Sequence, residues 1–138
     1  MSLSVHSIVE LGPTKVNASA RRLVALVCAA SAGVHAGLVP AHFRESALLG
    51  AAFALSVVLL AAGAVRLRAG TGADRGALWV AAVLLGVAAC YLLSLTTGLP
   101  VLAPEPESVD PLGVLTSLAE VVAAVAVLSL PRIGKERR

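Results

Sequence analysis

Four long apolar runs, separated by short polar or charged segments, constrain this chain more than any other feature. Each run is about 17 to 19 residues long, and they cover residues 23–39, 47–65, 77–95 and 112–130. At about 1.5 Å per residue, a helix of that length spans roughly 26 to 29 Å, close to the ~30 Å hydrocarbon core of a bilayer. The pattern predicts an all-α fold, a four-helix transmembrane bundle.

The composition supports a membrane protein and argues against a water-soluble bundle. Of the 138 residues, 58% are hydrophobic and 14% are charged, so there is too little polar surface to cover a soluble globule. The run at 47–65 contains one polar side chain, that of Ser56. We expect an N-terminal segment at 1–20, one membrane domain at 21–131 and a basic tail at 132–138.

The distribution of Lys and Arg predicts the orientation of the bundle. Ten of the eleven basic residues lie before the first run, between the second and third, or after the fourth, and only Arg44 lies in the remaining connections. Because cytoplasmic loops are enriched in Lys and Arg, both termini should be cytoplasmic. These cations flank helices and have no aromatic residues interleaved among them, so anionic lipid headgroups are favoured as partners over nucleic acid. The predicted location is the plasma membrane, as a multi-pass protein.

Two ionisable side chains lie inside the apolar runs, and these are the first candidates for a functional site. His35 is in the outer half of the first run, and Glu120 is near the middle of the fourth. A charged group facing lipid costs at least a few kcal/mol, so both should face the bundle interior. Their expected depths differ by about 5 Å. Tyr91 falls in the same layer, and the sequence therefore predicts a ligand or proton pocket formed by His35, Tyr91 and Glu120.

Helical spacing supports a polar seam through the bundle. Intervals of three, four and seven residues place four side chains on one face of the first helix, namely Cys28, Ser31, His35 and His42. Thr116 and Ser117 precede Glu120 by about one turn, where their hydroxyls can bond its carboxyl group or the adjacent backbone. A hydrogen-bonded pair that only fixes the packing of the helices explains the same residues.

A metal site is a second interpretation of the polar residues near the outer end. The candidate ligands are His35, His42, Glu45 and Glu105, and Glu107 and Asp110 face the same side and offer further carboxylate oxygens. Imidazole nitrogen and carboxylate oxygen suit zinc or copper(II). A solvated acidic loop and a histidine at the membrane interface account for these residues without any metal.

Small residues on the first run favour close helix packing. Ala29, Gly33 and Gly37 form a small-xxx-small ridge on the side away from His35. This ridge suits contact with a second helix, in a homo-oligomer or in a larger membrane complex.

Three segments together resemble a group of small four-span membrane proteins common in actinobacterial genomes. They are Gly33–Glu45 (GVHAGLVPAHFRE), 97–100 (TGLP) and 104–107 (PEPE). In that group a His, a Pro and a second His followed by Glu end the first span, and a loop of the TGLP and PEPE type precedes the fourth. The similarity covers roughly residues 21–130. Ala41 stands where an acidic residue is frequent in the group, which weakens a metal site inferred by resemblance.

The expected function is that of a small plasma-membrane protein with an outward-facing polar pocket for a metal ion, a proton or a small polar ligand. The alternatives are an accessory or assembly subunit of a larger complex and a small proton-coupled transporter. No Ser or Cys has a base and an orienting acid at a spacing typical of nucleophilic catalysis, so no enzyme activity is predicted.

Overall fold

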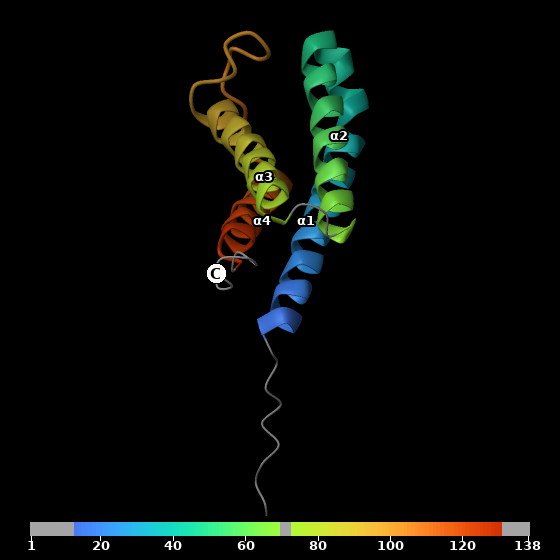
Figure 1. The fold of residues 1–138 in the computed structure, drawn as a ribbon. Helices are drawn as coiled ribbons and strands as arrows, with labels where there is room; N and C mark the ends of the chain where they lie inside the picture. Colours follow the sequence, from blue (N-terminus) through green and yellow to red (C-terminus); the bar gives the residue numbers. More distant parts are fainter. Residues whose placement is uncertain (1–12, 70–72, 131–138) are drawn as a thin grey trace, which may run out of the picture.

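The computed structural model describes residues 13–69 and 73–130. Four helices make up most of this part of the chain, and Figure 1 shows their arrangement: α1 (Pro13–Glu45), α2 (Ala47–Ala69), α3 (Ala73–Thr96) and α4 (Pro111–Leu128). Outside them, the described residues contain one isolated bridge, between Leu99 and Ala103. All four helices are long and apolar enough to cross a membrane. The predicted all-α, four-span fold is confirmed to that extent.

The helices extend beyond the apolar runs. α1 is 33 residues long, begins at Pro13 and continues through Pro40 to Glu45, so the helix includes residues 13–20 of the expected N-terminal segment. α2 includes Arg66 and Arg68, and α3 includes Arg75, so both helices are longer than the apolar runs at 47–65 and 77–95. Residues 1–12 and the basic tail at 132–138 lie outside the described residues.

Two helical hairpins form the described part of the molecule. α1 and α2 are joined through Ser46 alone, whose backbone N–H donates to the carbonyl of His42 and whose hydroxyl accepts from the N–H of Leu49. Phe43 packs directly on Gly50 in this tight connection, where a Cβ atom would overlap its ring. The second hairpin consists of α3, α4 and the long loop 97–110. In Figure 1 the two hairpins diverge toward the end that carries the Ser46 connection and the 97–110 loop.

The core lies at the opposite end, where the hairpins meet. We call this the closed end, and the end with the Ser46 connection and the 97–110 loop the loop end. Alanine, valine and leucine side chains from all four helices form the core, including Val24, Leu60, Ala64, Leu84 and Ala124. Because many of these side chains are small, the helix backbones can approach closely there.

The outer surface of the bundle is apolar. Large side chains such as those of Leu55 (58% exposed) and Val122 (60% exposed) point away from the core along the helices. A continuous surface of this kind is typical of a protein surrounded by acyl chains rather than by water.

Candidate functional site

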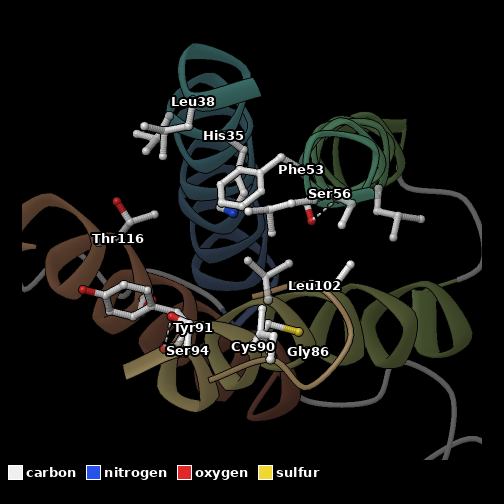
Figure 2. Close-up of a pocket in the computed structure, with 18 of the residues that line it drawn as sticks. His35, Leu38, Phe53, Ser56, Gly86, Cys90, Tyr91, Ser94, Leu102 and Thr116 are labelled. Atoms are coloured by element: carbon white, nitrogen blue, oxygen red, sulfur yellow. Dashed lines mark hydrogen bonds between the residues drawn. The ribbon is translucent and has the colours of Figure 1, made fainter. Parts of the chain in front are cut away.

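A cavity of about 550 Å³ lies at the loop end, between the two hairpins. Figure 2 shows His35 and Leu38 of α1 and Phe53 and Ser56 of α2 on one side, and Cys90, Tyr91 and Ser94 of α3 on another. The start of α4 and the 97–110 loop complete the walls. The volume is in the range of small-molecule binding sites, and the walls combine aliphatic and aromatic surface with a few polar groups, as such sites do.

His35 contributes an imidazole ring to this cavity. Its Nδ1 atom lies 2.9 Å from the backbone carbonyl oxygen of Ser31 and 3.5 Å from the Ser31 hydroxyl. A carbonyl oxygen only accepts hydrogen bonds, so Nδ1 carries the hydrogen. In the neutral ring, Nε2 is then the acceptor, and the described residues provide it with no hydrogen-bond partner.

Glu120 lies beneath the cavity rather than in its wall. Its side chain is completely buried, and its Oε1 atom accepts a hydrogen bond from the hydroxyl of Ser31. The other carboxyl oxygen, Oε2, is buried without a hydrogen-bond partner among the described residues. Ser31 therefore connects Glu120 of α4 to His35 of α1, because it contacts both.

The sequence predicted that His35, Tyr91 and Glu120 come together in one pocket, and the structure places them as follows. His35 and Tyr91 line one cavity, and Glu120 reaches His35 only through Ser31. The Tyr91 hydroxyl donates to the backbone carbonyl of Asp110, 3.0 Å away. The three side chains thus belong to one region, but the phenol contacts the start of α4 instead of the imidazole or the carboxyl group.

Tyr91 also fixes the position of α4. Its ring lies against Gly113, where an added Cβ atom would come within 2.6 Å of the ring. Asp110 caps the same helix, since its carboxylate accepts from the N–H of Gly113 at 2.7 Å, and Pro111 occupies the first turn. The acidic residue that ends the loop is thereby held at the rim of the cavity.

The 97–110 loop folds back over the end of α3. Gly98 has a φ of +71°, a conformation that glycine adopts readily, and the N–H of Leu99 donates to the carbonyl of Ala103 at 2.6 Å. The N–H of Glu107 donates to the carbonyl of Ser94 at 2.8 Å. These bonds hold Leu99 and Leu102 against the cavity, which both residues line.

The proposed metal ligands do not gather in one place. His42 Nδ1 lies 3.1 Å from Glu45 Oε2. His42 also stacks on Phe53 with ring centroids 3.8 Å apart, and His35 lies on the same phenylalanine at 5.5 Å. Glu105 is exposed in the loop and does not line the cavity. In residues 13–69 and 73–130 no group of three or more His, Cys, Asp or Glu side chains is placed to hold a metal ion.

The hydroxyl of Thr116 donates to the backbone carbonyl of Leu112, which is the second of the two alternatives predicted for it. The hydroxyl that reaches Glu120 is that of Ser31, from α1. The ridge of Ala29, Gly33 and Gly37 is exposed, and Cβ atoms built on the two glycines would have no neighbour within 4 Å. Within this chain the ridge packs against no other helix of the described part.

Two aromatic residues that line the cavity, Phe53 and Trp79, were not predicted from the sequence. Glu107 and Asp110 also line it, and the sequence had indicated them only as further carboxylates on the side of the metal ligands. Asp110 had a readable signal, because an Asp directly before a Pro and an apolar run is typical of a helix N-cap. The sequence did not separate Glu107, which lines the cavity, from Glu105, which does not, since a proline-rich loop has no periodicity.

Comparisons with known protein families, with curated proteins and with solved structures find no match. The resemblance to small actinobacterial four-span proteins therefore stays a prediction. Fold and cavity together define the class, a four-helix protein with the properties of a multi-pass membrane protein and a small-molecule-sized cavity between its hairpins.

Proposed function

We propose that this chain is a multi-pass plasma-membrane protein that binds a small ligand in the cavity at its loop end. With both termini in the cytoplasm, as the Lys and Arg distribution predicts, that cavity opens on the extracytoplasmic side. The observation that carries the proposal is the cavity itself, about 550 Å³ between two hairpins whose closed end is well packed.

A cavity-filling variant tests this proposal. Gly86 lines the cavity, and a Cβ atom built on it meets nothing within 4 Å, so Gly86→Leu adds a side chain at a position where its first carbon has room. Ala89→Leu is the matched control, because Ala89 is exposed on the same helix and does not line the cavity.

The measurement is native mass spectrometry of protein extracted in mild detergent. We expect a small molecule to be retained by the unaltered protein and by Ala89→Leu, and to be lost from Gly86→Leu. An unaltered protein without any retained molecule, or equal retention by both variants, would reject a ligand-binding cavity.

A second candidate function, proton-coupled transport, is favoured by the buried Glu120 carboxyl group. Its Oε2 atom has no partner in the described parts of the chain, and the contacts found there include no Lys or Arg side chain beside it. An ionised carboxylate costs far more to bury than a neutral acid. In this candidate function Glu120 holds a proton, and the Ser31 hydroxyl and the His35 ring connect it to the cavity.

Glu120→Gln tests the proton-coupled alternative. Glutamine keeps the size of the side chain and an oxygen that accepts from Ser31, but it cannot release a proton. In proteoliposomes with an imposed pH gradient, ligand movement should stop in this variant while ligand binding persists. Unchanged gradient-driven movement would exclude Glu120 as the proton carrier.

A further inference from the structure

We propose that the ligand of the loop-end cavity is a lipophilic organic cation, such as a bulky substituted ammonium or phosphonium ion. This inference rests on the proposed ligand-binding function and names the class of ligand. It depends on three properties of the cavity: the sign of its charges, its aromatic surfaces and its apolar walls.

The charged side chains of the cavity are acidic. Glu107 and Asp110 line it, and its lining includes no Lys or Arg. The carboxylate of Asp110 is held in place as the cap of α4. Glu107 has its backbone fixed to Ser94, and no side-chain partner for it occurs among the described residues. Glu107 and Asp110 are both exposed residues that line the cavity, and two carboxylates there attract a cation and repel an anion.

The wider surroundings have the same sign. At the loop end the described chain carries Glu45 and Glu105 in addition to the two cavity acids, against the single arginine Arg44. A cation approaching this end therefore meets a mainly negative surface before it reaches the cavity.

Aromatic rings supply the second property. Phe53, Trp79 and Tyr91 line the cavity from α2 and α3, and the guanidinium of Arg66 already lies over the Trp79 ring, 5.6 Å from its centroid. Ring faces attract cations, so the surface available to a ligand cation comes from Phe53 and Tyr91. The Nε2 atom of His35, whose Nδ1 donates to Ser31, adds an acceptor for an N–H group of a protonated amine.

The apolar walls select among cations. Val34, Leu38, Val83 and Leu102 contribute aliphatic surface. A small hydrated metal ion would lose its water here without gaining several oxygen or nitrogen ligands, and no three-ligand group is found in the described residues. A cation whose charge is covered by hydrocarbon has little hydration to lose, and its apolar groups gain contact with the walls.

Fluorescence of Trp79 provides the assay. It is the only tryptophan of the sequence, and it lines the cavity. The protein in lipid nanodiscs is titrated with tetraphenylphosphonium and, separately, with the neutral triphenylphosphine oxide, which carries similar phenyl groups without the charge. Empty nanodiscs and the Gly86→Leu variant correct for partition into lipid.

The decisive variant is Glu107→Gln with Asp110→Asn, in which asparagine retains the ability to cap α4. We expect saturable quenching by the phosphonium ion, and an affinity at least roughly fivefold lower in the double variant, from the loss of two nearby charges. Glu105→Gln removes an acid of the same loop that does not line the cavity, and should change the affinity less than about twofold.

The possible outcomes distinguish a failure of the cation proposal from a failure of the proposed ligand-binding function. If the neutral oxide binds as well as the phosphonium ion and the double variant has no effect, the cation proposal is wrong, while the cavity still binds ligands or lipid. If neither probe binds better than to Gly86→Leu, the cation proposal is also wrong. Native mass spectrometry of the extracted protein, which looks for a retained ligand, then tests the binding function independently.

Discussion

Ser31 of α1 donates its hydroxyl hydrogen to the carboxyl group of Glu120 on α4, across 89 positions of the sequence. This bond joins the first helix to the last just below the cavity. Because Ser31 is also bonded to His35 through its backbone carbonyl, it holds a cavity residue and the buried acid in one arrangement. The bond therefore couples the packing of the two hairpins to the floor of the site.

Removing this hydroxyl should destabilise the fold. In Ser31→Ala the Oε1 atom of Glu120 loses its donor while its carboxyl group stays buried, which costs about 1 to 3 kcal/mol. Thermal unfolding in detergent measures the loss. Ser56→Ala is the control, because the Ser56 hydroxyl donates only to the carbonyl of Ala52 in its own helix.

A double-mutant cycle isolates the pair. In a Glu120→Leu background, Ser31→Ala should cost clearly less than it does with Glu120 present, since there is no buried acid left to satisfy. Equal losses in the two backgrounds would mean that Ser31 contributes through packing alone.

The contact between Tyr91 and Gly113 should tolerate no extra carbon. Gly113→Ala places a Cβ atom 2.6 Å from the Tyr91 ring, so the ring or the start of α4 must move, at a cost of about 1 to 3 kcal/mol. Gly33→Ala, where a Cβ atom has no neighbour within 4 Å, serves as the control and should not destabilise.

Both variants are compared by thermal unfolding. Combining Gly113→Ala with Tyr91→Ala should cost less than the sum of the two single changes, because the overlap disappears with the ring. Simple additivity would show that the close contact is not the source of the loss.

The two cysteines should differ in reactivity. Cys28 is 1% exposed in the core, whereas Cys90 is exposed and lines the cavity. In mild detergent a maleimide should modify one thiol per chain, and Cys90→Ala should abolish rapid labelling while Cys28→Ala preserves it. Labelling of Cys28 as fast as that of Cys90 would contradict the packing at the closed end.

The orientation is tested with reporter fusions. Ten of eleven Lys and Arg residues lie on the side of the termini and of the α2–α3 connection. Green fluorescent protein at the C-terminus should therefore fluoresce, and alkaline phosphatase inserted at Glu105 should be active. The reverse pattern would place the cavity on the cytoplasmic side. A phosphatase inserted in the α2–α3 connection is the control and should be inactive.

The helices were largely predictable because their signal is local. Runs of apolar residues as long as a bilayer is thick mark a spanning helix without reference to any other part of the chain. The ends were less predictable: α1 includes residues 13–20, because polar residues can continue the backbone hydrogen bonds of a helix beyond the apolar run. It also passes through Pro40, although proline has no N–H for one of these bonds.

The site was predictable only in part. His35 and Glu120 were identified because ionisable groups are rare inside apolar runs. Their link through Ser31, the contact of Tyr91 with α4 and the placement of Glu107 on the cavity all depend on how two hairpins pack. None of these follows from spacing along one helix.

The sequence by itself determined that the chain has four apolar helices, which way their basic flanks should face, and which two ionisable groups require shelter from lipid. The tertiary structure alone decided that the hairpins pack tightly at one end and diverge at the other, which opens a cavity of about 550 Å³. The physical reason is that burial of a side chain along a helix depends on local periodicity, whereas the space between helices depends on side-chain volumes from all four at once.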